Sequence, residues 1–254
     1  MTQKLIHRAL SSIAKSGARI LLIGGQACVF YGAAELSRDI DLLIYPDSET
    51  LDLLRAALQE LQAVPIAVPD LSPEVLLRGH AAHFRCKRED VAELRIDVMA
   101  VLRNCDGFEK LWQRRTVLDV DGMVVNVLAT EDLVQAKKTQ RDKDWPTVRR
   151  LVEESYLRKE AVLSPSNISF WLRELRTPEL LIEAAKRFPE EAADLSASRP
   201  ALRAAIEENK ASMTKYLAEE LALETERDIA YWEPLKKELE AFRAAKRIDR
   251  NSPS

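Results

Sequence analysis

Residues 20–45 read ILLIGGQACVFYGAAELSRDIDLLIY, and this stretch decides the fold of the first half of the chain. It opens on a short apolar run that ends at Gly24-Gly25, which predicts a buried strand entering a tight turn. Residues 26–32 have the character of a short helix that begins at this turn. Residues 39–45, DIDLLIY, predict a second strand. A strand, a glycine turn, a helix and a second strand in this order predict an α/β domain.

The rest of the first half continues the same texture. Apolar spacing predicts an amphipathic helix before the first strand, and Ser48 is a suitable cap for a helix after the second one. A long loop with several prolines follows, then two more strands, and Asp121-Gly122 is a strong hairpin signal between a further two. Thr130 caps the next helix. The expected segments are helices over 5–16 and 49–61, a loop over 62–81, and strands over 82–87, 94–102, 116–120 and 123–128.

The second half has a different composition. After about residue 145 the strand signals vanish, and Leu, Ala, Glu, Lys and Arg dominate. Thr177-Pro178 predicts a helix start. Pro200 opens another helix, with an apolar face at Leu202, Ile206, Met213 and Leu217, and residues 231–247 predict a further one. We therefore expect an α/β (α+β) domain over residues 1–150 and an all-helical domain over residues 151–254.

Bulk properties place the chain among soluble globular proteins. Hydrophobic residues make up 46% and charged residues 31%, and the formal net charge is −3. This charge does not indicate a general nucleic-acid or membrane surface. The three cysteines have no CxxC spacing and are odd in number. This pattern favours free thiols in a reducing compartment. With no span-length apolar segment, we expect a cytoplasmic protein that does not associate with membranes.

Three aspartates are the strongest candidates for chemistry. Asp39 and Asp41 alternate with Ile40 along a strand, so both carboxylates leave the same face. Asp97 interrupts an otherwise apolar strand, where an unpaired carboxylate is destabilising. Like charges held together favour a bound cation. The alternatives are an exposed strand start for the first pair and, for Asp97, a salt bridge to a nearby arginine, Arg85 or Arg95.

Two further segments are suited to anions. Gly24 and Gly25 lie between a strand and a helix, where a glycine backbone can approach a phosphate closely, although such a pair is more often only a tight turn. Lys137 and Arg141 are four residues apart, which predicts one helix face, with Asp144 a turn further on. They suit a phosphate clamp, or else form a solvated basic face. His80, His83 and Cys86 lack a fourth zinc ligand, which favours a histidine near the substrate instead.

The run IGGQACVFYGAAELSRDIDLLI resembles the signature of minimal nucleotidyltransferases: a glycine pair, a short helix, a Ser or Thr, then acid-x-acid. The later run EDLVQAKKTQRDKDW resembles a segment of abortive-infection (AbiE-type) nucleotidyltransferase toxins of toxin–antitoxin pairs. The resemblance covers about residues 18–150. It implies a DNA polymerase beta-like mixed sheet with flanking helices, and two Mg²⁺ (or Mn²⁺) held by three acids. It also implies transfer of a nucleoside monophosphate from a nucleoside triphosphate to a hydroxyl group, with release of pyrophosphate.

Carried over by position, the resemblance assigns Asp39, Asp41 and Asp97 to metal and catalysis. It assigns triphosphate or nucleotide binding to Gly24, Gly25, Ser37, Lys137, Arg141 and Asp144. The acceptor stays open between RNA such as a tRNA end, a protein side chain and a small molecule.

Two positions depart from the family pattern. Gln26 stands where a serine commonly follows the glycines, and Glu35 stands where several relatives have arginine. Both changes weaken or reshape triphosphate binding, so a non-catalytic binding or regulatory protein of the same fold is the first alternative. A metal-dependent nuclease is the second, but it would not need the glycine turn.

Overall fold

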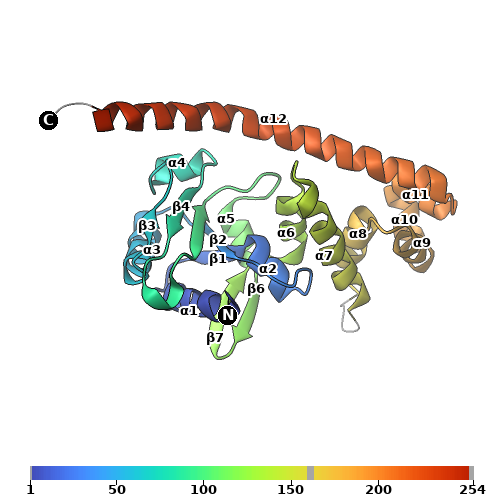
Figure 1. Cartoon of the computed structure of the whole chain (residues 1–254). Helices are drawn as coiled ribbons and strands as arrows, with labels where there is room; N and C mark the ends of the chain where they lie inside the picture. The colour runs from blue at the N-terminus through green and yellow to red at the C-terminus, as the bar shows by residue number, and fades with distance from the viewer. Residues whose placement is uncertain (1, 159–162, 252–254) are drawn as a thin grey trace. The chain divides into compact units, whose positions relative to one another are not determined.

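The computed structural model describes residues 2–158 and 163–251, which divide into two compact units (Figure 1). The sheet unit comprises the chain up to Phe30, Ala34–Ala136, and the chain from Ala230 onward. The helical unit comprises Tyr31–Ala33 and Lys137–Ile229. The division into two domains after residue 150, expected from the sequence, stays a prediction.

The sheet unit contains a mixed seven-stranded sheet in the order β3-β4-β5-β2-β1-β7-β6. β2 runs antiparallel to β1 and parallel to β5, and β1 runs parallel to β7. The strands are β1 (Ile20–Ile23), β2 (Asp39–Ile44), β3 (Val64–Pro65), β4 (Ala82–Arg85), β5 (Arg95–Met99), β6 (Thr116–Val120) and β7 (Met123–Val127). The mixed sheet with flanking helices and the helical C-terminal region, both expected from the sequence, are confirmed.

Helices alternate with the strands of this sheet along the chain. They are α1 (Thr2–Lys15), α2 (Gly24–Phe30), α3 (Ser48–Glu60), α4 (Pro73–Leu77), α5 (Phe108–Gln113) and α6 (Thr130–Lys137), with a 3-10 turn, η1, at Glu89–Val91. The N-cap of α3 is Asp47 and not Ser48 as expected. An Asp47 carboxylate oxygen accepts a hydrogen bond of 2.7 Å from the backbone N–H of Thr50, so the shorter serine one position later is left inside the helix.

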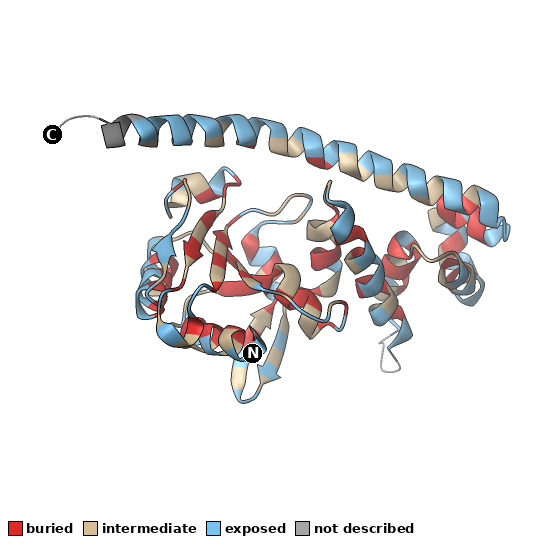
Figure 2. Cartoon of the chain, viewed as in Figure 1, coloured by how far each residue is buried: buried red, intermediate tan, exposed pale blue. Residues whose placement is uncertain are grey.

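The central strands are the core of the sheet unit, as the concentration of buried residues in Figure 2 shows. All four residues of β1 are buried, as expected for a strand with neighbours on both sides and covered faces. Each fully buried aliphatic side chain stabilises the fold by about 1.5–3 kcal/mol. On β2 the buried Ile40 and Leu42 alternate with the half-exposed Asp39 and Asp41, so one face of the sheet is apolar and the other carries charge.

The first helix covers the apolar face. Leu10 and Ile13 of α1 line a small gap together with Leu22 of β1 and Leu42 of β2, which places α1 on the side of the sheet opposite the aspartates. The amphipathic pattern expected for residues 5–16 is thereby confirmed. On the other side of β2, Asp39 and Asp41 stay partly exposed.

The helical unit is built from a series of helices. They are α7 (Trp145–Leu157), preceded by a 3-10 turn, η2 (Asp142–Asp144), then α8 (Pro165–Glu174), α9 (Pro178–Arg187), α10 (Pro189–Ser196), α11 (Pro200–Ile206) and the first part of α12 (Lys210–Asn251). The four from α8 to α11 each begin with proline. Proline at the first helical positions costs no hydrogen bond, because the N–H groups there have no partner within the helix. None of the helices in the described ranges combines the length and apolar character needed to cross a membrane.

The single helix expected after Pro200 is wrong, since two helices occupy this stretch. α11 ends at Ile206, which is 46% exposed, and Glu208 adopts a left-handed conformation with φ of 53°. The side chain of Asn209 then accepts a hydrogen bond of 3.0 Å from the N–H of Ser212. This N-cap starts the next helix and overrides the continuous apolar stripe.

The C-terminal part of α12 belongs to the sheet unit and packs on the end of the loop before β4. Leu235 is 7% exposed, and the ring of Phe242 lies edge-on to His80 at 5.4 Å. The buried His80 imidazole is 3.0 Å from a carboxylate oxygen of Glu238. Gly79 has a φ of +100°, and an added Cβ there would lie 2.9 Å from the hydroxyl oxygen of Tyr231. The last helix therefore completes the sheet unit.

Leu235→Ala should destabilise the sheet unit by about 2–3 kcal/mol, because it leaves a cavity in a buried contact. Urea denaturation at pH 7 measures this loss. Leu223→Ala removes a 46% exposed leucine from the same helix and serves as the control, with a change of about 0.5 kcal/mol or less. Equal small losses in both variants would show that the C-terminal part of α12 adds nothing to the unit.

Candidate functional site

The half-exposed face of the sheet brings the three predicted aspartates onto neighbouring strands. Asp41 of β2 is the register partner of Asp97 of β5 in the parallel pair, and Asp39 is the partner of Arg95. His83 of β4 is the register partner of Asp97 on its other side. Since residues in register on one face are close neighbours, His83, Asp97 and Asp41 form one row across three strands.

Asp97 is 13% exposed at its side chain and accepts two hydrogen bonds. Its Oδ1 lies 2.8 Å from Nδ1 of His83 and 2.7 Å from Nε of Arg95. Burial raises the pKa of this carboxyl, but His83 and Arg95 outweigh burial and hold the pKa below its ordinary value of 3.8. Asp97 is therefore ionised at neutral pH, and the salt bridge to Arg95 considered from the sequence is present.

The positive charge of Arg95 interacts with all three aspartates. Its pKa is raised first by the hydrogen bond to Asp97, against burial, and then by the charges of Asp97, Asp39 and Asp41. Its guanidinium group also lies 3.1 Å from Nδ1 of His83. When that nitrogen carries a hydrogen it donates to Asp97, and when it does not it accepts from Arg95. Because the ionised carboxylate of Asp97 can only accept, the 2.8 Å hydrogen bond places the hydrogen on Nδ1 of His83.

The glycine turn lies directly against these acids. A Cβ at Gly24 would be 1.9 Å from Oδ2 of Asp41, and a Cβ at Gly25 would be 2.6 Å from Oγ of Ser37. The backbone N–H of Gly25 donates a 3.4 Å hydrogen bond to the same Asp41 oxygen. Gly24 has a φ of +67°, which side chains rarely adopt. The sheet unit therefore gathers Gly24, Gly25, Ser37 and Asp41, four residues that the sequence assigned to one site.

Gly24→Ala should destabilise the protein by at least about 3 kcal/mol, because the methyl group collides with Asp41 in addition to the strain of a positive φ. Gly17→Ala is the matched control. Gly17 has a φ of +75° with no atom within 4 Å of its Cβ position, so only about 1–2 kcal/mol should be lost there. Urea denaturation of both variants gives the difference. Equal losses would contradict the close approach of the turn to Asp41.

The donor chemistry of the acid face suits a divalent cation. Carboxylate oxygens are the ligands that Mg²⁺ and Mn²⁺ prefer, and Gly24 leaves the Asp41 carboxylate a space that any other side chain would fill. In the part of the chain that the structure describes, no three His, Cys, Asp or Glu side chains already converge to hold a metal. Asp97 gives one oxygen to His83 and Arg95, so metal binding there requires its other oxygen or a shift of Arg95.

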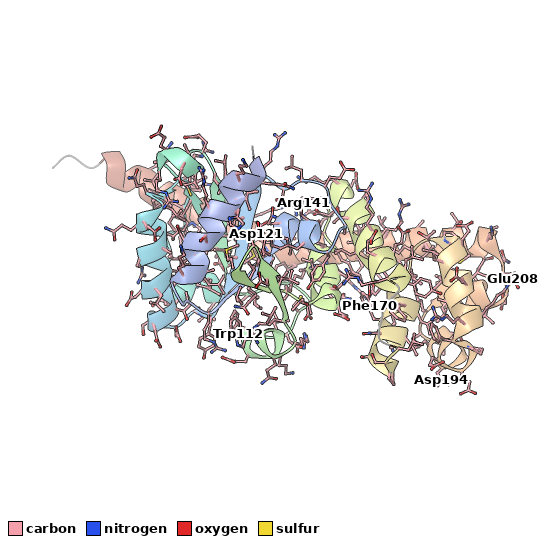
Figure 3. The ribbon with its side chains drawn as sticks, turned by 90° about the horizontal axis from the view of Figure 1, so that it is seen from below. Trp112, Asp121, Arg141, Phe170, Asp194 and Glu208 are labelled. Carbon is pink, nitrogen blue, oxygen red and sulfur yellow. The ribbon has the colours of Figure 1, made fainter. Side chains whose placement is uncertain are left out.

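The predicted basic residues of the helical unit are arranged differently from expectation. α6 ends at Lys137, so Lys137 and Arg141 do not share a helix face, and that expectation is wrong. Both cations instead contact the buried Asp144, at 3.4 Å from Lys137 Nζ and 2.8 Å from Arg141 Nε, and the Thr139 hydroxyl donates to it at 2.7 Å. Figure 3 labels Arg141. These contacts hold residues 137–144 around the carboxylate of Asp144, in a conformation that does not continue α6.

The pKa of Asp144 is below its ordinary value of 3.8. Burial raises it, but the Lys137 charge, the Thr139 hydrogen bond and Arg141 lower it further than burial raises it. A lowered folded-state pKa stabilises the native state above the unfolded value, and this contribution is lost as the pH falls through the folded value.

Asp144→Asn should therefore cost about 2–3 kcal/mol at pH 7, and the difference from the parent should shrink as the pH falls below about 4. Urea denaturation across this range measures both effects. Asp142→Asn, at an exposed position two residues earlier, is the control and should stay close to the parent at every pH. A difference that does not vary with pH would refute an ionised, buried Asp144.

The remaining candidates separate. His83 lies beside Asp97, whereas His80 pairs with Glu238 and Cys86 is buried, so these three do not form a cluster. Glu35 is exposed in the loop before β2. Gln26 is buried at 4% exposure and lines a different cavity, described below. Its helical spacing with Val29 and Phe30 was the available signal that it faces away from the glycine turn.

No family model matches the chain, and no curated protein matches it. Among solved structures, the chain is similar to an antigenic nucleotidyltransferase-like protein from Paracoccidioides brasiliensis at 15% identity, covering 81% of this chain and 93% of that one, with a TM-score of 0.40. It is also similar to a candidate nucleotidyltransferase from H. pylori at 15% identity, covering 87% and 95%, with a TM-score of 0.41. Both are loose likenesses, and neither carries information about the activity of this chain.

Proposed function

We propose that this chain is a metal-dependent nucleotidyltransferase that moves a nucleoside monophosphate from a nucleoside triphosphate to a hydroxyl acceptor. The observation that carries the proposal is the placing of Asp39, Asp41 and Asp97 on one half-exposed sheet face, against a Gly24-Gly25 turn that leaves no room for a Cβ. A stable fold does not need three like charges at one place. A polyanionic substrate that arrives with divalent cations does.

In this proposal Asp39, Asp41 and Asp97 hold Mg²⁺ or Mn²⁺. The metal neutralises charge on the phosphates and on the attacking oxygen when it is bound. Before metal binds, Arg95 offsets part of the negative charge. Its guanidinium group donates a hydrogen bond to Asp97 and interacts electrostatically with the other two carboxylates. Three carboxylates against one guanidinium group leave the face negative, so in this proposal divalent metal must bind before an anionic substrate can.

The residues of the chain have separate tasks. Gly24 and Gly25 let the backbone approach the triphosphate, and the hydroxyl of Ser37, on the loop before β2, lies beside Gly25. Asp97 stays ionised at neutral pH, as a carboxylate that accepts the proton of the acceptor hydroxyl must. We assign His83 to orienting Asp97 through its 2.8 Å hydrogen bond.

The nucleotide-binding role of Lys137 and Arg141 stays part of the proposal. Both now contact Asp144, so we assign Asp144 to positioning the two cations instead of to the nucleotide. The acceptor stays open between a tRNA end, a protein side chain and a small molecule. Membership of the abortive-infection type toxins of toxin–antitoxin pairs rests on the sequence resemblance alone.

A second candidate function is a non-catalytic binding protein of the same fold. One observation favours it: Arg95 already satisfies the charge of Asp97, so the acid face is stable with no metal. The burial of Gln26 also removes any side chain at that position from the glycine turn. The two functions differ in whether divalent metal and triphosphate bind together.

Asp41→Asn should abolish metal-dependent binding of nucleoside triphosphate and leave the thermal stability equal to or above that of the parent, because like-charge repulsion is relieved. Calorimetric titration of each triphosphate with Mn²⁺ present tests the first expectation. Asp52→Asn, a 73% exposed acid on α3, is the control and should bind as the parent does.

Catalysis is tested separately by incubating the parent and Asp41→Asn with labelled triphosphates and total RNA or protein. Label transfer by the parent alone supports the transferase. Binding of metal and triphosphate without any transfer to RNA, protein or small molecules supports the non-catalytic alternative. Equal triphosphate affinity in the parent and in Asp41→Asn contradicts both the metal site and the proposed function.

A further inference from the structure

A cavity of about 530 Å³ lies in the sheet unit between α1, α2 and the tip of the β6–β7 hairpin. Figure 3, where Asp121 is labelled, shows the hairpin tip beside α1, and His7 of α1 lies 3.8 Å from Asp121. α1 covers the apolar face of the sheet, so this cavity is separate from the acid face. Its volume falls in the range of small-molecule sites.

The wall of the cavity contains a buried amide without a partner. Gln26 is 4% exposed, and no hydrogen bond joins its side chain to another described residue. Its amide atoms are not sealed off inside the protein, so their donor and acceptor are available in the cavity to a ligand that offers both. Nε2 of His7, on the same wall, is also buried and has no hydrogen-bond partner among the described residues. Gln26, with no hydrogen bond to a described residue and an open cavity beside it, is the polar group on this wall that suits a ligand.

The rest of the lining defines the shape of that ligand. Val29 and Phe30 of α2, Leu10 of α1 and Met123 of β7 supply apolar surface. A phenyl ring and a thioether suit the face of a flat heteroaromatic ring. A side-chain amide at the edge of such a ring can form a pair of hydrogen bonds with an adjacent donor and acceptor, as glutamine does with adenine.

Charge at the mouth favours an anion. Lys4 and Arg8 are exposed on the turn of α1 that lines the cavity, against a single acid, Asp121. Arg8 also donates a 3.5 Å hydrogen bond to the backbone carbonyl of Asp90, which leaves further donors on its guanidinium group. Two cations at the rim of an apolar cavity suit a phosphate attached to the ring system.

We propose that this cavity binds a nucleoside monophosphate. The base contacts Gln26 and the apolar wall, and the phosphate contacts Lys4 and Arg8. The site needs no divalent metal, and it does not rest on the function proposed for the acid face. It also accounts for glutamine after the glycine pair, since Gln26 serves this cavity and not the turn.

The test is calorimetric titration of the full chain with AMP, GMP, CMP and UMP in EDTA, which keeps metal from the acid face. We expect at least one nucleotide to bind with a dissociation constant below about 1 mM, the weak end of specific ligand binding. Gln26→Leu should weaken it at least about tenfold, as loss of one buried hydrogen bond does, and should keep or raise the melting temperature.

A second pair of variants keeps the test independent of the buried position. Lys4→Ala should weaken a monophosphate but not its nucleoside, whereas Lys15→Ala, at the other end of α1, should change neither. Absence of binding by all four nucleotides would overturn the proposal. So would equal binding by Gln26→Leu and the parent, or binding lost in Asp41→Asn instead.

Discussion

Electrostatic repulsion among Asp39, Asp41 and Asp97, on adjacent strands, is the constraint that the neighbouring side chains must offset. The parallel register sets Asp41 beside Asp97, and the two-residue period of β2 adds Asp39 on the same side. Burial of Asp97 makes this repulsion more costly, because the charge is held away from water. Arg95 lowers that cost with a fixed positive charge, and His83 adds a hydrogen bond. An acid face arranged in this way is stabilised by contacts within the sheet unit itself.

The short helix α2 serves two surfaces of the sheet unit. Its first residues, Gly24 and Gly25, lie against Asp41 and Ser37, while Gln26, Val29 and Phe30 line the cavity beside α1. A helix of seven residues has few internal hydrogen bonds of its own, so its position depends on what packs against it. The two surfaces therefore share one short stretch of backbone, so a substitution that shifts α2 should alter both.

Local patterns in the sequence were enough to predict the glycine turn, the hairpin at Asp121-Gly122 and the strands other than β3, since each depends on neighbours in the chain. The two-residue β3 lies in the stretch 62–81 that was expected to be a loop, because its pairing with β4 is not a local pattern. The strand register was not predictable, because it depends on how β4, β5 and β2 align across distant segments. The sequence therefore named Arg95 as a possible partner of Asp97 without showing that it serves all three acids. The helix break at Asn209 was missed for a local reason, because a capping side chain outweighed a regular apolar stripe.

The sheet unit is discontinuous in the sequence, and this sets an order on its formation during synthesis. Residues up to Ala136 leave the ribosome first, but the segment that covers His80 and Gly79 is made only after the whole helical unit. Domains fold as they emerge, at about 5–20 residues per second. The nascent sheet unit must therefore wait several seconds with this surface open to solvent. The helical unit has time to form its own core during the same interval. The C-terminal part of α12 is then the last segment to pack, and it covers the exposed surface of the sheet unit.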